Sequence, residues 1–271
     1  MATKIFLKGG GHMPTKYPVI LVHGIAAKQS WVMNAFGKIG DALEADGNDV
    51  YIADNDGFGR IATNAEQLRV FVENVLEKTG KEKVNIIAHS KGGLDSKYMI
   101  TELGMEDKIA SLTTLCTPHR GSIVASWIWK LPRFIKRIIA FFINTFYKYS
   151  MGDKYPDAMG ACEELLPIDE SEQTLSFSAK IYCQSYSSSL KRARDCFIMA
   201  LPMKMTKHFQ KVENDGLVSV DSAKFANYRG EAFDFSVSHV QIIDLFSKSE
   251  QKEKIYLFYR SICDELAEMG F

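Results

Sequence analysis

The sequence predicts an α/β fold in which a mostly parallel sheet is covered by helices on both faces. Short apolar runs at residues 17–22, 50–53, 84–88 and 112–116 have the length of buried strands. Segments with helical spacing of apolar residues separate these runs. Because parallel strands need a crossover between them, this alternation places helices on the two faces of the sheet.

The helical segments begin and end at recognisable signals. Residues 31–46 carry apolar side chains at helical spacing, and Gly47 ends the pattern. The tetrapeptide at 63–66, Thr-Asn-Ala-Glu, fits a capping box, so we expect the next helix to begin there and to end at Gly80. Further along we expect a helix over 94–103, strands over 179–185 and 232–237, and a last helix over 252–268.

The composition is that of an ordinary globular protein. Of the 271 residues 46% are hydrophobic, and 33 basic residues balance 33 acidic ones, which argues against nucleic-acid binding. There is no run of eighteen apolar residues and no secretory signal pattern, so we expect a cytoplasmic protein. The five cysteines indicate small core residues, with one bridge among Cys162, Cys183 and Cys196 left open. The oligomeric state is not indicated.

The motif that carries chemistry is the pentapeptide Ala88-His89-Ser90-Lys91-Gly92. It matches the nucleophile-elbow pattern Gly-x-Ser-x-Gly, with alanine in place of the first glycine. It directly follows an apolar strand and precedes a helix, which is the context that the motif requires. We therefore predict that Ser90 is a nucleophile at the tip of a strained strand-to-helix turn, rather than a turn serine.

Two backbone N–H groups are candidates for an oxyanion hole. The N–H of Lys91 lies at the first turn of a helix, where unpaired N–H groups and the helix dipole favour negative charge. The N–H of Ile25 follows the strand at 17–22, and His23 in the same loop is expected to brace that loop by hydrogen bonding. One such donor lowers an acyl-transfer barrier by roughly 3 kcal/mol.

A serine nucleophile needs a histidine base and an acid, which follow it in that order in this kind of fold. The order leaves His119, His208 and His239 as bases, and we favour His239 because it follows a late predicted strand. Asp215 lies at an Asn-Asp-Gly turn and would orient the imidazole, although a turn aspartate explains it equally well. The alternative acids are Asp195, Asp221 and Asp234.

These stretches resemble the bacterial triacylglycerol lipases of the Pseudomonas and Burkholderia type, members of the α/β-hydrolase superfamily. The matching segments are PVILVHGI at 18–25, KVNIIAHSKGGLDSKY at 83–98, TPHRGS at 117–122, NDGLVS at 214–219 and SHVQIIDLF at 238–246. The resemblance implies one α/β-hydrolase domain over residues 1–271, with a helical lid. It also implies Asp215 as acid, His239 as base, and Ile25 and Lys91 as oxyanion donors.

One position departs from this lipase pattern. The resemblance implies a structural calcium ion with an aspartate ligand two residues after the base, where this chain has Gln241. A neutral amide is a poor ligand for a hard dication, so we predict that the calcium site is absent or weak, and we expect no cofactor.

Residues 122–160 are the predicted lid or cap. They are rich in large apolar side chains with basic residues between them, and Pro132 divides them into two helices. We expect the inner face to contact the acyl chain through the residues Trp127, Trp129, Phe134, Ile138 and Phe142.

The sequence thus predicts a carboxylic ester hydrolase, either lipase or carboxylesterase, for hydrophobic small-molecule esters or lipids. The basic residues of the cap would suit contact with a lipid–water interface, but a solvated face is the favoured use of these charges. The alternatives are an acyltransferase with the same triad and a non-catalytic lipid-binding homologue.

Overall fold

The computed structural model describes residues 12–28, 34–168 and 181–271. Within them the strands form one parallel sheet with the order β2-β1-β3-β4-β5-β6. The strands are β1 (Val19–Val22), β2 (Val50–Ile52), β3 (Val84–His89), β4 (Ile109–Leu115), β5 (Tyr182–Ser187) and β6 (Asn227–Glu231). The predicted parallel α/β sheet is confirmed.

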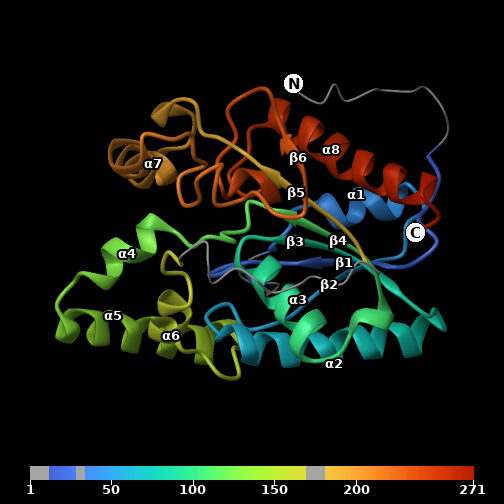
Figure 1. The fold of residues 1–271 in the computed structure, drawn as a ribbon, viewed down its shortest axis with the longest axis horizontal. Helices are drawn as coiled ribbons and strands as arrows, with labels where there is room; N and C mark the ends of the chain where they lie inside the picture. The colour runs from blue at the N-terminus through green and yellow to red at the C-terminus, as the bar shows by residue number, and fades with distance from the viewer. Residues whose placement is uncertain (1–11, 29–33, 169–180) are drawn as a thin grey trace.

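Helices cover both faces of this sheet (Figure 1). One face carries α1 (Ile39–Ala45) and α8 (Ser249–Glu268), and the other carries α2 (Ile61–Thr79) and α3 (Lys91–Glu102). Successive residues of β1 point alternately into the two cores: Leu21 packs with α1 and α8, whereas Ile20 and Val22 pack with α2. The apolar runs are uniformly hydrophobic because the strands are buried on both faces.

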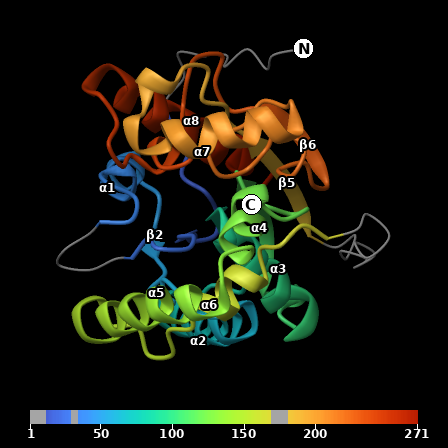
Figure 2. The same ribbon diagram turned by 90° about the vertical axis from the view of Figure 1, so that its left-hand side faces the viewer.

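A second group of helices lies together on one side of the molecule (Figure 2). It contains α4 (Ile123–Trp129), α5 (Arg133–Phe146), the π-helical turn η2 (Tyr147–Met151) and α6 (Ala158–Glu163), with α7 (Phe197–Gln210) beside them. Pro132 separates α4 from α5, as predicted. Short 3₁₀ turns occur at Glu106–Lys108, Ala193–Asp195 and Gln241–Ile243.

The predicted helix starts are wrong by several residues: α3 begins at Lys91 rather than 94, α8 begins at Ser249 rather than 252, and two further starts differ for reasons that the structure shows. The helix expected from residue 31 begins at Ile39; residues 29–33 lie outside the described part, and Gly37 just before the helix has φ +51°. The helix expected from the capping box at 63–66 already begins at Ile61. The backbone N–H of Ile61 donates to the Glu164 carboxylate at 2.7 Å, so a side chain from α6's end replaces the local cap. The predicted stop at Gly80 is confirmed, with φ +65°.

The strand predicted at 232–237 is also wrong, because β6 lies just before it. Residues 232–237 leave the sheet as a loop whose Phe233 and Val237 are buried in the core beside α8. Their burial explains the apolar pattern that suggested a strand. In the part of the chain that the structure describes, no helix is long and apolar enough to cross a membrane.

Candidate active site

Ser90 occupies the turn between β3 and α3 in a strained conformation, with φ 54° and ψ −132°. A non-glycine residue adopts positive φ at a cost that the surrounding structure must offset. The turn is tightly enclosed: a Cβ added at Gly24 would lie 2.5 Å from the Cβ of Ser90 and 3.0 Å from its Oγ. The loop after β1 therefore lies directly against the predicted nucleophile.

Ser90, His239 and Asp215 form one continuous buried hydrogen-bond relay. The hydroxyl of Ser90 donates to Nε2 of His239 at 2.8 Å, and Nδ1 of His239 donates to Oδ2 of Asp215 at 2.7 Å. The backbone N–H of His239 also donates to the carbonyl of Asp215 at 2.9 Å. The structure thus brings together the three residues that the sequence selected, in the geometry of a nucleophile, a base and an orienting acid.

Asp215 is at once a turn residue and the partner of the imidazole. Its Oδ1 accepts from the backbone N–H groups of Leu217 and Val218 at 2.9 and 2.8 Å, while Oδ2 faces His239. The two explanations weighed from the sequence are therefore compatible, one for each carboxylate oxygen. Of the alternative acids, Asp195 pairs with Arg192, Asp221 pairs with Lys224, and Asp234 is exposed.

Three further buried histidines surround this relay or its supporting loops. His89 donates from Nε2 to the backbone carbonyl of His239 at 2.9 Å, which adds a further restraint on the base. Nδ1 of His23 lies 3.1 Å from the carbonyl of Gly24, so the expected bracing of the loop is present. His119 stacks on Phe225 and contacts Thr114. His208 lies on α7 with its ring edge-on against Phe209, and neither of these two alternative bases lines the cavity that contains Ser90.

Burial keeps these histidines neutral. It lowers the pKa of His23 to about 4, that of His119 to about 3, and that of His89 well below the ordinary value of 6.5. Below pH 6.5 the unfolded chain therefore binds protons that the folded chain does not, so stability is lost as the pH falls toward 4. Asp95 acts in the opposite direction, because burial raises its pKa to about 6.

The two predicted oxyanion donors lie beside Ser90. Ile25 lines the same cavity as Ser90 and His239, and Lys91 is the first residue of α3, where its N–H has no partner within the helix. The side chain of Lys91 is buried elsewhere: its ammonium contacts Asp95 at 2.6 Å, and Asn64 donates to the other oxygen of that carboxylate at 3.0 Å. Lys91 is thus placed to act through its backbone.

A cavity of about 410 Å³ opens onto Ser90 and His239. Its wall is almost wholly apolar, and most of it comes from α4, α5 and α6. The cap residues that line it are Ser122, Val124, Ala125, Ile128, Trp129, Leu131, Lys136, Ile139, Ala140, Ile143, Ala158 and Met159, and Cys162 lines it just beyond the cap. Such a cavity can enclose a hydrophobic acyl chain next to the nucleophile.

The prediction of which cap residues face the substrate needs correction. Trp129 lines the cavity, but Phe134, Ile138 and Phe142 lie on the opposite side of α5 and are more than half exposed. Trp127 packs edge-on against Phe209 of α7. The helix is apolar on both sides, so the sequence could not tell which stripe faces inward.

Cys116 is a buried neighbour of the relay that sequence reasoning placed only as a core residue. Its sulfur lies within 4.8 Å of a carboxylate oxygen of Asp215 and a ring nitrogen of His239, and 3.2 Å from the hydroxyl of Ser188. Burial and the charge of Asp215 hold the pKa of this thiol well above its usual range. Its position directly after β4, at the same edge of the sheet as Ser90, was the one sequence signal that could have placed Cys116 near the active site. Cys116 is free, as are Cys162, Cys183, Cys196 and Cys263.

Gln241 occupies the position of the aspartate ligand that the lipase resemblance implies. Its Oε1 accepts from the backbone N–H of Ser238 at 3.0 Å. Its Nε2 donates to the carbonyl of Asp195 at 3.2 Å and to Oε1 of Gln251 at 3.3 Å. Because an NH₂ group points at these two oxygens, the residues present do not fit a calcium ion.

The parallel sheet, the serine turn and the relay together define an α/β hydrolase, and a sequence comparison agrees. The family model described as the α/β-hydrolase fold matches residues 17–155, and the chain belongs to this family.

Among individual proteins, the chain is similar to bacterial triacylglycerol lipases. It is 38% identical over 146 residues to one of Pseudarthrobacter phenanthrenivorans, covering 49% of this chain and 44% of the relative. One of Burkholderia plantarii is also 38% identical over 146 residues, with 49% and 39% covered. The chain thus spans less than half the length of these two relatives. Triacylglycerol lipase 2 of Saccharomyces cerevisiae is 29% identical over 258 residues, covering 84% of this chain and 72% of the relative.

Solved structures share the fold. A metagenomic carboxyl esterase superimposes with a TM-score of 0.72 at 16% identity, covering 96% of this chain and 78% of the esterase. The mature form of a Bacillus licheniformis lipase superimposes with a TM-score of 0.58 at 20% identity, covering 86% and 88%.

Proposed function

We propose that the protein hydrolyses carboxylic esters with hydrophobic acyl chains through an acyl-enzyme on Ser90. The observation that carries this proposal is the relay of Ser90, His239 and Asp215 at the base of an apolar cavity. The names of the relatives, which are triacylglycerol lipases, support the same reaction class.

The geometry supports a two-step mechanism. The Ser90 oxygen attacks the ester carbonyl while Nε2 of His239 takes its proton, and the resulting imidazolium is stabilised by Asp215. The oxyanion accepts from the N–H groups of Ile25 and Lys91. The tetrahedral intermediate expels the alcohol, which receives the proton from His239. Water, deprotonated by His239, then cleaves the acyl-enzyme to the carboxylic acid and restores Ser90.

The cap, residues 122–160, is proposed as a lid over the acyl-binding cavity. Its support is that α4, α5 and α6 supply most of the cavity wall while lying to one side of the sheet, at the left in Figure 1. A substrate with a long acyl chain would contact Ile128, Ile139 and Ile143, whereas a short ester would leave that wall empty. We therefore expect medium or long acyl chains to be preferred over acetyl.

The outer side of the cap is proposed to contact a lipid–water interface. Phe134, Phe141 and Phe142 on α5 are each about two-thirds exposed. The chain from 123 to 151 carries five lysines and arginines and no acidic residue, although the whole chain has no net charge. Exposed aromatic side chains beside cations are suited to an interface that contains anionic lipids.

The nucleophile is tested by labelling wild type and Ser90→Ala with a fluorophosphonate and by assaying p-nitrophenyl esters of rising chain length. We expect labelling and hydrolysis by wild type only. The control is Ser261→Ala, which removes a partly buried serine hydroxyl on α8 and should behave as wild type. Equal labelling of wild type and Ser90→Ala would refute the assignment. Product analysis with a competing alcohol distinguishes hydrolysis from acyl transfer.

A further inference from the structure

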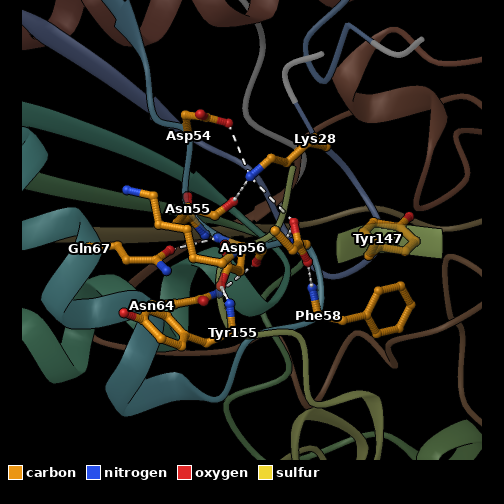
Figure 3. A network of polar contacts seen from close by, with 12 residues as sticks. Lys28, Asp54, Asn55, Asp56, Phe58, Asn64, Gln67, Tyr147 and Tyr155 are labelled. Carbon is orange, nitrogen blue, oxygen red and sulfur yellow. Dashed lines mark hydrogen bonds and ion pairs between the residues drawn. The ribbon is translucent and has the colours of Figure 1, made fainter. Parts of the chain in front are cut away.

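A buried polar network joins the end of the cap to the loop that carries Ile25 (Figure 3). It connects three segments: the oxyanion loop, residues 23–28; the loop after β2, residues 54–60; and the cap anchor, residues 147–158, which runs from η2 to the start of α6. None of these contacts is needed for the relay itself, so the network calls for an explanation of its own.

Ala26, next to Ile25, is held at both of its backbone polar groups. Its N–H donates to the carbonyl of Gly57 at 2.9 Å, and its carbonyl accepts from the hydroxyl of Tyr147 at 2.6 Å. Ala26 has φ +62°, a left-handed conformation that disfavours any residue with a Cβ. The two hydrogen bonds therefore maintain a peptide geometry that the chain would not adopt alone.

Asp153 holds the loop after β2 against the oxyanion loop. Its fully buried carboxylate accepts from the backbone N–H groups of Gly57 and Phe58, both at 3.0 Å. The ammonium of Lys28, itself almost fully buried, lies 3.3 Å from the same carboxylate and 3.1 Å from the exposed Asp54. The contacts close a ring from Ala26 through Gly57 and Asp153 to Lys28, two residues after Ala26.

Two further contacts fix the cap anchor to the loop after β2. The carboxylate of Asp56 accepts from the backbone N–H groups of Lys154 and Tyr155 at 2.8 and 2.7 Å. The ring of Tyr147 packs edge-on against that of Phe58, with centroids 4.5 Å apart. In Figure 3 the two rings lie side by side, and Lys28 points toward Asp54. Because its ring is held against Phe58, the hydroxyl of Tyr147 is already oriented toward the carbonyl of Ala26.

We propose that Tyr147 and the Lys28–Asp153 pair are positioning residues for the oxyanion hole, so that the cap anchor and the oxyanion loop act as one unit. The inference rests on the proposed ester hydrolysis. The network fixes Ala26 at its N–H, in the Ile25–Ala26 peptide, and at its own carbonyl. The N–H of Ile25 belongs to the preceding Gly24–Ile25 peptide. A change in the backbone torsions of Ile25 that followed the release of Ala26 would turn this N–H away from the oxyanion. A misplacement of about 1 Å at a catalytic group can lower the rate about a hundredfold.

The sharpest variant is Tyr147→Phe, because it removes one oxygen and keeps the ring on Phe58. We expect kcat for p-nitrophenyl butyrate to fall about tenfold while KM stays within about twofold. The inhibition constant of a trifluoromethyl ketone, whose adduct carries the oxyanion, should rise by about the same factor as kcat falls. Tyr149→Phe is the matched control, because Tyr149 is a largely exposed tyrosine two residues away.

The ion pair is tested by Lys28→Met, Asp153→Asn and the double variant. Lys28→Met leaves the buried Asp153 without its opposite charge, and Asp153→Asn leaves the buried Lys28 paired only with the exposed Asp54. Each single variant should therefore lower kcat, and the double variant should lose less than the product of the two single losses. Losses that multiply would overturn the role of the pair. The double variant also carries the test if Tyr147→Phe does not fold.

The outcomes separate the two proposals. If wild type is neither labelled at Ser90 nor active on esters, the proposed function fails. If wild type is active and Tyr147→Phe keeps kcat and the ketone inhibition constant within about twofold of wild type, only the positioning inference fails. A fall in thermal stability with unchanged kcat would assign Tyr147 a purely structural role and would also overturn the inference.

Discussion

Asp215→Asn should abolish most of the activity while leaving the fold intact. The two roles of this carboxylate are separable, since Oδ1 holds the turn at Leu217 and Val218 and Oδ2 accepts from His239. An asparagine keeps an oxygen for the turn but presents an NH₂ group to the imidazole. His239 would then carry its proton on Nε2, facing Ser90, and could not act as base. The same change of tautomer in a serine protease costs about 10⁴ in kcat, or about 5 kcal/mol of barrier.

Comparison with Asp215→Ala makes this reasoning refutable. Alanine removes both roles and leaves two backbone N–H groups without their acceptor, which costs about 1–3 kcal/mol for each buried group. We therefore expect urea denaturation to show Asp215→Asn close to wild type and Asp215→Ala clearly less stable, with both inactive on p-nitrophenyl butyrate. The control is Asp221→Asn, on an exposed aspartate. If Asp215→Asn retained more than about a tenth of wild-type kcat, the tautomer argument would be wrong.

Three further predictions concern the whole chain and the cap. Because burial keeps three histidines neutral, the free energy of unfolding from urea titrations should decrease as the pH is lowered from 6.5 to 4, and a flat profile would contradict the burial argument. Because the NH₂ group of the Gln241 amide faces two oxygens, a chelator should change neither the activity nor the melting temperature. A sharp fall in either quantity that added calcium reverses would show that the protein does bind calcium. Phe141→Asp should weaken co-sedimentation with phosphatidylglycerol vesicles without changing the hydrolysis of a short soluble ester. The control Val70→Asp, at an exposed apolar position on α2, should leave both co-sedimentation and hydrolysis unchanged. Equal vesicle binding by wild type and Phe141→Asp would refute the proposal that α5 contacts the lipid–water interface.

The sequence alone predicted the parallel sheet, apart from the position of β6, and it selected Ser90 and His239, which the fold brings within hydrogen-bond distance. Strands buried on both faces require continuous apolar runs, and the turn at Ser90 requires small neighbours, so both features are encoded within a few residues. His239 followed from chain order together with its place near a strand end. The acid was harder to predict, because Asp215 lies in a turn where aspartate is common even in proteins without catalytic activity.

Tertiary structure alone decided the features that depend on distant segments. The start of α2 is set by Glu164, which lies 103 residues from its partner Ile61, and local capping signals cannot include such a contact. The side of α5 that faces the cavity could not be predicted, because both its cavity side, with Ile139 and Ile143, and its exposed side, with Phe134 and Phe142, carry large apolar residues. The contact between Lys28 and Asp153 could not be predicted for the same reason. In the sequence each residue resembles an ordinary exposed charged residue, and only the fold buries the two side chains together.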